Sequence, residues 1–190
     1  MFLLKKALLF TNIKQDLIMG RKHKVDEHTW MSEEEYQLVT GKSVIPCVDL
    51  VILRKDIKGD IGILLLIRKT GYGTGGWCLI GGRQWKGETA EETIDRQARD
   101  VGIKVETIPP FQPNFPAWIN DDPNQDKTKH PCSMTYPVKI ISGQVRDEGE
   151  EYKGWKWFSV KEIPKMNYGH RFQVLKTLEQ LKKFNALNEI

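Results

Sequence analysis

The segment from Gly81 to Ile103, GGRQWKGETAEETIDRQARDVGI, constrains the fold more than any other part of this 190-residue chain. A double glycine opens it, and neither Gly nor Pro interrupts the stretch 88–101, in which helix-forming residues dominate. We therefore expect a glycine break in the chain that leads into a helix. At 3.6 residues per turn, one stripe of that helix carries Glu88, Glu92, Arg96 and Asp100.

Two interpretations of this acidic stripe remain open. A helix face with several oxygen ligands, set against a glycine turn with exposed carbonyls, can hold Mg²⁺, which accepts carboxylates, carbonyls, waters and phosphate oxygens. Such an ion would bind a diphosphate and polarise an attacking water. Alternatively, the stripe is a solvent-exposed helix face whose i,i+4 ion pairs contribute a few tenths of a kcal/mol each. The double glycine favours the ligand site, because a surface helix does not require it.

The remainder of the chain reads as one mixed α/β domain. Apolar runs predict strands, and a capping box at Ser32 and a Leu-containing C-terminal segment predict helices. We expect Pro46 to confine its strand to a sheet edge, and Leu175, Leu178 and Leu181 to be core residues. A proline-rich stretch, 109–132, is expected to be a long functional loop. The expected strands are 43–55, 62–68, 77–80, 103–108, 133–141 and 155–158, and the expected flanking helices are 32–39 and 171–187.

Charge and cysteine content limit the possible partners and compartment. Residues 1–25 carry six basic residues and one acidic residue, Asp16, so their net charge is +5. Because the whole chain has a net charge of +4, the remaining residues have a net charge of −1. A nearly neutral body argues against nucleic-acid binding. No window is long and apolar enough to cross a membrane. Three widely spaced cysteines without a CxxC pair favour a reducing cytoplasm. We expect a basic leader over 1–28 and a single domain over 29–190.

The glycine–helix segment resembles the Nudix box, a glycine, five residues, Glu, seven residues, then Arg-Glu-aliphatic-x-Glu-Glu-x-Gly-aliphatic. Gly82, Glu88 and Arg96 match it with the correct spacings, and Gly102-Ile103 supplies the closing pair. Gln97 stands in place of the Glu that follows the Arg. The run from Arg96 to Gly102 is also one residue short, so Asp100 alone remains of the final acidic pair.

Other features of the chain are similar to the GDP-mannose mannosyl hydrolase branch of Nudix enzymes, which also has a carboxylate-poor box. These features are a short acidic helix before the first strand, an Asp within that strand (Asp49), an Arg closing the second strand (Arg68), and aromatic-x-x-x-Gly-Gly-Arg (Trp77 to Arg83). An Asp-Asp loop that leads into a strand is a further match. The resemblance spans roughly residues 29–172.

This resemblance implies an α/β/α sandwich around a mixed, largely antiparallel sheet, and a site that binds Mg²⁺ or Mn²⁺. Arg68 and Arg83 would hold the diphosphate, because the planar guanidinium gives bidentate contacts to phosphate. Asp49 and Trp118 are further substrate-binding candidates, Trp118 through stacking on a nucleobase. The implied metal ligands are the Gly81 carbonyl, Asp100, Gln97 and, from a later loop, Glu151.

The general base is not settled by the resemblance. Mannosyl hydrolases use a His in the later loop to activate attack at the sugar carbon, but Tyr152 occupies that place here, and a phenol with a pKa of about 10 is a poor base. Glu150 or Glu151 would suit the commoner Nudix reaction, in which water attacks phosphorus. His130 and His170 are the remaining alternatives.

We therefore expect a Mg²⁺-dependent hydrolase of a nucleoside diphosphate linked to another moiety, with a sugar nucleotide such as GDP-mannose as the leading substrate. One alternative is a pyrophosphohydrolase that attacks phosphorus in ADP-ribose or a nucleoside triphosphate. Another is a Nudix-fold module that has lost catalysis and only binds a nucleotide. The missing carboxylates of the box favour this alternative. The resemblance also suggests a homodimer, with a small-molecule nucleotide as the ligand.

Overall fold

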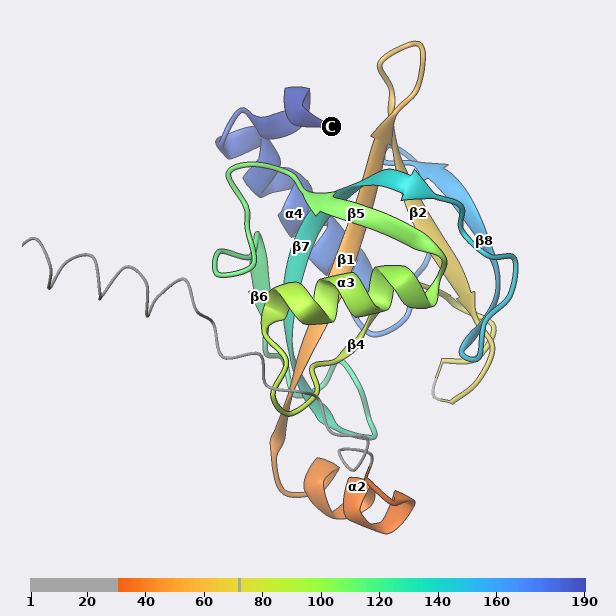
Figure 1. The fold of residues 1–190 in the computed structure, drawn as a ribbon, viewed down its shortest axis with the longest axis vertical. Coiled ribbons are helices and arrows are strands. Elements are labelled where there is room, and N and C mark those ends of the chain that lie inside the picture. The colour runs from red at the N-terminus through yellow and green to blue at the C-terminus, as the bar shows by residue number, and fades with distance from the viewer. Residues whose placement is uncertain (1–30, 72) are drawn as a thin grey trace, which may run out of the picture.

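The computed structural model describes residues 31–71 and 73–190, so the predicted leader over 1–28 lies outside the described residues. An α/β fold of the expected kind is confirmed (Figure 1). In chain order the elements are α2 (Glu33–Thr40), β1 (Val44–Lys55), β2 (Ile61–Arg68), β3 (Trp77–Cys78), β4 (Ile80–Arg83), α3 (Ala90–Asp100), β5 (Ile103–Thr107), β6 (Trp118–Asn120), β7 (His130–Gly143), β8 (Tyr152–Ser159), α4 (His170–Lys183) and the 3₁₀ helix η2 (Ala186–Glu189).

The sheet is mixed and mostly antiparallel. Its main path runs β3-β2-β1-β7-β5, with β4 paired to β1, β6 to β7 and β8 to β2. β1 and β7 run parallel, and every other strand pair in the described residues is antiparallel. Two strands pair with the same edge of β1: β4 pairs with its first half, and β2 pairs with its last residues. This shared strand brings the glycine segment of β4 beside the centre of the sheet.

Pro46 does not mark a sheet edge, so that prediction was wrong. β1 is paired with β7 from its first residues, and Pro46 is aligned with Cys132. On its other side, the Pro46 carbonyl accepts the Gln84 N–H at 2.9 Å. The N–H that proline lacks would face Gln84, so the one bond that proline forgoes lies beyond the last residue of β4.

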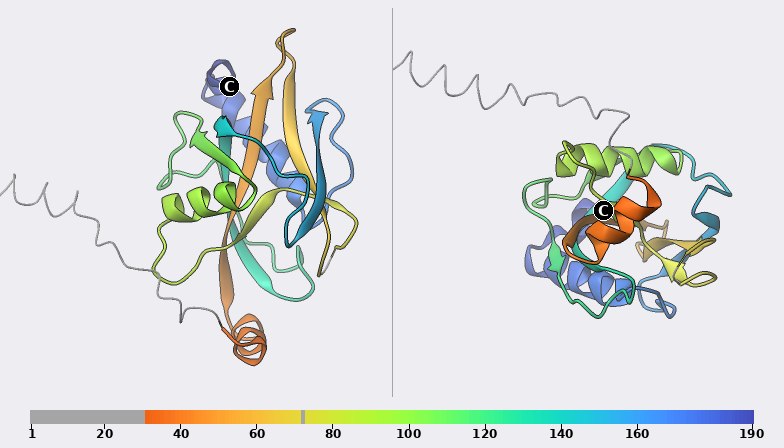
Figure 2. Two further views of the ribbon diagram at one scale, coloured as in Figure 1. Left: turned by 45° about the vertical axis from the view of Figure 1, so that its right-hand side comes forward. Right: turned by 90° about the horizontal axis from the view of Figure 1, so that it is seen from below.

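Two apolar cores lie on opposite faces of β1. Even-numbered residues of that strand, such as Leu50, pack with α3 and β8, whereas odd-numbered residues, such as Val51, pack with α4. The two helices lie on different sides of the sheet, and α2 sits apart at the start of β1 (Figure 2). The capping box predicted at Ser32 is present, with Ser32 and Glu35 each accepting the other's backbone N–H.

Three further predictions need correction. Leu175 is 41% exposed and is not a core residue, because α4 presents Gln173, Val174, Thr177 and Leu181 to the sheet instead. The stretch 109–132 contains a short strand, β6, which pairs with β7. The double glycine lies inside β4 rather than in a break, and the turn follows it. None of the described helices is long and apolar enough to span a membrane.

Candidate functional site

The turn after β4 is fastened to α3 by a buried ion pair. Arg96 donates from Nε to Glu88 Oε1 at 2.6 Å and from Nη2 to Oε2 at 2.8 Å, and the two side chains are only 12% and 4% exposed. Glu88 also accepts the Trp85 N–H and the Thr93 hydroxyl. Burial raises the pKa of Glu88, but the hydrogen bonds from Arg96, Trp85 and Thr93 outweigh it and leave the pKa below its usual value. Glu88 is therefore an ionised structural anchor, with its oxygens already committed.

Gly81 is required by the close packing of β4 on β1. Gly81 is aligned with Asp49, and a Cβ at position 81 would collide with the Asp49 carboxylate and with the β1 backbone. Along an antiparallel strand pair, hydrogen-bonded and non-hydrogen-bonded residue pairs alternate. Because the Gln84 N–H bonds the Pro46 carbonyl, the aligned pair Gly81 and Asp49 is a non-hydrogen-bonded one, and the N–H and C=O of Gly81 point away from β1. The Gly81 carbonyl predicted as a metal ligand therefore faces the open side of β4.

Gln97 and Asp100 occupy very different surroundings on α3. Gln97 is buried, and its Nε2 donates to the Gly82 carbonyl at 3.0 Å, whereas its Oε1 is buried without a hydrogen-bond partner. The Asp100 side chain is 61% exposed, and its Oδ2 lies 3.8 Å from Arg96 Nη1. Gln97 thus presents an amide oxygen beside the glycine segment, and Asp100, one turn after Arg96, presents an exposed carboxylate in a loose ion pair with that arginine.

Arg68 is held at the end of β2 by two contacts from later parts of the chain. Its Nη1 lies 3.3 Å from Glu151 Oε2, and its guanidinium carbon lies 5.4 Å from the centre of the Tyr168 ring. The Nε of Arg68 is buried and has no hydrogen-bond partner among residues 31–71 and 73–190. Glu151 is 69% exposed, so this pair is open to an incoming anion. Sequence analysis missed Tyr168, because no motif marks it.

Arg83 is the last residue of β4. It is aligned with Cys47 on β1, and its guanidinium lies 5.1 Å from the ring of Tyr36, a residue of α2. Its Nη1 is buried without a partner, as the Arg68 Nε is. Two arginines thus each present a buried donor that no group of the described chain satisfies, and such donors are costly unless an acceptor arrives.

Asp49 forms the centre of a buried polar group beneath α4. Gln173 Nε2 donates to Asp49 Oδ2 at 3.0 Å, although the two residues are 124 positions apart in the sequence. His170, at the start of α4, accepts the Leu79 N–H through Nδ1 at 3.1 Å. Asp49 is therefore a fixed acceptor rather than a free carboxylate, and Gln173 is a second residue that sequence analysis missed.

Trp118 and Asp49 are both aligned with Thr135 of β7, so Trp118 lies two strands from Asp49 and under the same helix, α4. Trp118 stands edge-on to Phe172 and under the Lys176 ammonium, and its Nε1 is buried without a partner. His130 is held by the Asp121 carbonyl at 2.8 Å. Glu150 is exposed in the loop between β7 and β8.

Tyr152 is buried, which raises the pKa of its phenol further above the usual range. This rise in pKa agrees with the expectation that Tyr152 is a poor base.

Protonation of His170 is expected to destabilise the fold. Desolvation lowers the pKa of His170, Asp49 raises it and Arg68 lowers it, with a net decrease. The unfolded chain therefore takes up this proton at higher pH than the native state, and stability should decline as pH falls below about 6.5. His170→Asn keeps an acceptor for Leu79 and should show a smaller decline in urea unfolding between about pH 7 and pH 5. Equal declines in both proteins would contradict this role.

Comparison with known proteins identifies the family of this chain. The family model of the NUDIX domain matches residues 44–178. The chain belongs to the NUDIX family. It is 31% identical over 116 residues to an ADP-ribose pyrophosphatase of Methanocaldococcus jannaschii, a match that covers 60% of this chain and 64% of that protein, slightly less than two thirds of its length.

Solved structures share the NUDIX fold. A MutT/nudix family protein from Enterococcus faecalis aligns with a TM-score of 0.58 and 14% identity, over 81% of this chain and 76% of the other. The NUDIX domain of Shewanella oneidensis NrtR, solved in complex with ADP ribose, aligns with a TM-score of 0.56 and 19% identity, over 80% of this chain and 99% of the other.

The residues at the glycine segment suit a metal ion only in part. NUDIX hydrolases generally use divalent metals such as Mg²⁺ or Mn²⁺. Within 31–71 and 73–190, no three or more His, Cys, Asp or Glu side chains gather as a metal-binding cluster. Mg²⁺, however, commonly binds through one or two carboxylates together with waters and substrate phosphates. Asp100 and the orphaned Gln97 Oε1 fit an ion that a bound diphosphate helps to hold, and they do not fit a site closed by protein ligands alone.

Proposed function

We propose that this NUDIX protein hydrolyses a nucleoside diphosphate linked to a second moiety, with compounds of the ADP-ribose kind as substrates. The observation that carries the proposal is the pair of buried, unsatisfied guanidinium donors, Arg68 Nε and Arg83 Nη1. A diphosphate supplies acceptors for both, and arginine binds phosphate oxygens with its planar fork.

Glu151 is our candidate for the residue that activates water. Its carboxylate now pairs with Arg68, and a diphosphate that binds Arg68 would compete for that guanidinium and release Glu151 as a base. Glu150, its exposed neighbour, is the alternative. Attack of the activated water on phosphorus would release a nucleoside monophosphate and a sugar phosphate.

A divalent ion would be held by Asp100, the Gly81 carbonyl and Gln97 Oε1, with phosphate oxygens and water completing its coordination. When bound, such an ion neutralises phosphate charge and polarises the bond under attack. Because the protein ligands are few, we expect Mg²⁺ or Mn²⁺ to bind well only together with nucleotide.

ADP-ribose is a better candidate than GDP-mannose. The relative from Methanocaldococcus jannaschii is an ADP-ribose pyrophosphatase, and the NrtR NUDIX domain was solved with ADP ribose. Neither comparison supports the GDP-mannose substrate that the sequence suggested. Asp49 and Trp118 remain proposed contacts for the nucleoside part, and homodimerisation and a cytoplasmic location remain predictions.

A second candidate function is nucleotide binding without hydrolysis. The observation that favours it is the bond from Gln97 Nε2 to the Gly82 carbonyl, which places an amide donor where the NUDIX motif has a carboxylate. Such a protein would keep the arginine pair and its ligand but lack turnover.

A substrate panel separates these candidates. The purified protein is incubated with ADP-ribose, GDP-mannose, UDP-sugars and nucleoside triphosphates, with and without Mg²⁺, and the products are identified by mass. We expect AMP and ribose 5-phosphate from ADP-ribose in the presence of Mg²⁺. GDP and mannose from GDP-mannose would indicate attack at carbon. Binding of ADP-ribose by thermal shift without any product would instead support the binding module.

Arg68→Ala is expected to raise the KM for ADP-ribose about 10- to 100-fold, because a charge-assisted hydrogen-bonding group is removed from the diphosphate. Lys69→Ala is the matched control. Lys69 is the next residue along the chain, and it pairs with the exposed Glu148 instead of Glu151. Initial-rate kinetics on both variants measure the difference, and a wild-type KM in Arg68→Ala would remove Arg68 from the diphosphate site.

A further inference from the structure

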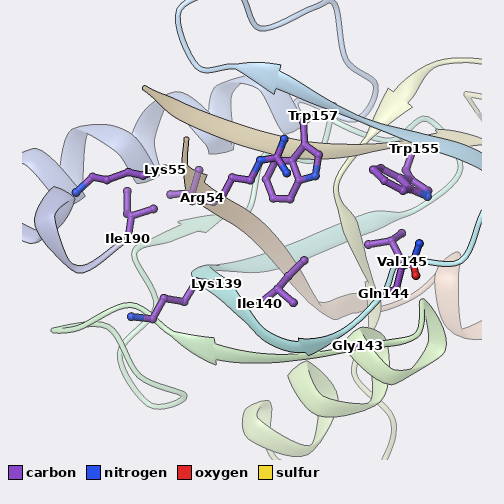
Figure 3. A pocket seen from close by; sticks show the side chains of 11 residues that line it. Arg54, Lys55, Lys139, Ile140, Gly143, Gln144, Val145, Trp155, Trp157 and Ile190 are labelled. Atoms are coloured by element: carbon purple, nitrogen blue, oxygen red, sulfur yellow. The ribbon is translucent and has the colours of Figure 1, made fainter. Parts of the chain in front are cut away.

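A cavity of about 480 Å³ lies at the end of β1 remote from α2, away from the site described above (Figure 3). Trp155 and Trp157 of β8 form one wall, and Ile140 and Val145 face them from the other side. No residue of the stretch 81–100 lines it. Its volume is in the range of pockets that hold small organic ligands, roughly 300–1,000 Å³.

The rim of this cavity is positively charged. Arg54, Lys55 and Lys139 line it, and no Asp or Glu side chain does. Lys139 is already paired with Glu106 at 3.2 Å, but the Arg54 guanidinium and the Lys55 ammonium form no ion pair or hydrogen bond with the described part of the chain. The Arg54 guanidinium carbon lies 4.0 Å from the centre of the Trp157 ring, and this stacking leaves its N–H edge free for an anion.

The wall of the cavity also contains an unsatisfied donor. Trp155 Nε1 is buried and finds no acceptor in the part of the chain that the structure describes. Tryptophan N–H groups usually find a partner when they are buried, so an orphaned one that lines a cavity indicates a missing acceptor. The cavity thus combines flat aromatic and aliphatic walls, a buried donor and the free Arg54 guanidinium.

We propose that this cavity is a second ligand site, for a small molecule that carries a planar aromatic ring and an anionic group, of the class of nucleoside monophosphates. The ring lies between the Trp155–Trp157 wall and the Ile140–Val145 wall. Arg54 binds the phosphate, and Trp155 Nε1 donates to an acceptor on the ring or sugar. The evidence for this site comes from its own residues. Only the choice of AMP as the first probe rests on the proposed function, because AMP is an expected product of that reaction.

The experiment is a titration of the ¹⁵N-labelled full chain with AMP, followed through the tryptophan indole N–H signals in NMR spectra. Trp155→Phe and Trp157→Phe assign the two signals. We expect AMP to shift both, and we expect adenosine, which lacks the anion, and ribose 5-phosphate, which lacks the ring, to bind at least about tenfold more weakly. Arg54→Ala should raise the Kd for AMP about tenfold.

Two control variants separate this site from the first. Lys156→Ala removes a cation from the same strand, but Lys156 lies over Phe158 and does not line the cavity, so AMP binding should be unchanged. Arg68→Ala should leave the AMP shifts of Trp155 and Trp157 unchanged, whether or not the protein hydrolyses ADP-ribose. The proposal is overturned if AMP at about 10 mM moves neither signal, or if Arg68→Ala abolishes the shifts and Arg54→Ala does not.

Discussion

Arg96→Ala is expected to lower the free energy of unfolding by about 3–5 kcal/mol, the usual cost of removing one partner of a buried ion pair. The variant would leave Glu88 ionised at 4% exposure, with only the Trp85 N–H and the Thr93 hydroxyl to stabilise its charge. It would also remove the donor to the Arg83 carbonyl and the cation that stacks 4.0 Å from the Trp85 ring. The turn between β4 and α3 should therefore loosen as well.

Chemical denaturation of three further variants tests the cause of this loss. Arg99→Ala removes an exposed cation from the same helix and should change stability by less than about 0.5 kcal/mol. Glu88→Gln keeps an acceptor for Trp85 and Thr93 while it removes the charge. Glu88→Gln combined with Arg96→Ala should be more stable than Arg96→Ala alone, because the uncompensated charge is absent. A single Arg96→Ala variant within about 1 kcal/mol of wild type would contradict the buried pair.

The sequence marks the glycine–helix segment that holds this anchor but not the pairing itself, because it places Glu88 on the helix, whereas α3 begins at Ala90. Glu88 lies in the turn before α3, and this turn folds back so that its carboxylate reaches Arg96, eight residues later, while Glu92 is used in the capping box with Thr89. The apolar runs predict β1, β2 and β5, because their alternation and content reflect the two cores that they separate.

The rest depends on contacts between distant parts of the chain. Gln173 and Asp49 are 124 positions apart in the sequence, and Tyr168 and Arg68 are 100 positions apart. No local motif therefore signals either contact. β6 is three residues long and exists because β7 offers it an edge, a tertiary effect that a proline-rich sequence hides. The inward face of α4 differs from the prediction for a related reason, since its polar residues Gln173 and Thr177 are fully buried and Gln173 bonds Asp49.

The second large effect is expected at Asp100, the exposed carboxylate at the end of α3. We expect Asp100→Asn to lower Mg²⁺-dependent turnover of ADP-ribose at least about 100-fold, because a bound divalent ion contributes several kcal/mol of charge stabilisation in the transition state. Its exposed side chain makes only a 3.8 Å contact with Arg96, so stability should change by less than about 0.5 kcal/mol. Kinetics at saturating Mg²⁺, with thermal unfolding of the same samples, separates the two effects.

Two comparison variants make this test specific to the metal. Asp95→Asn removes an exposed carboxylate from the same helix, off the stripe that carries Asp100, and should retain wild-type turnover. Gln97→Glu restores the carboxylate of the NUDIX motif. It removes the donor to the Gly82 carbonyl, so we expect lower stability together with tighter Mg²⁺ binding in the absence of nucleotide. If Asp100→Asn turned over ADP-ribose at the wild-type rate, the metal would have to be held elsewhere. If Gln97→Glu bound Mg²⁺ no better, the buried amide would be a packing residue, and the ion would depend on Asp100 and the substrate phosphates alone.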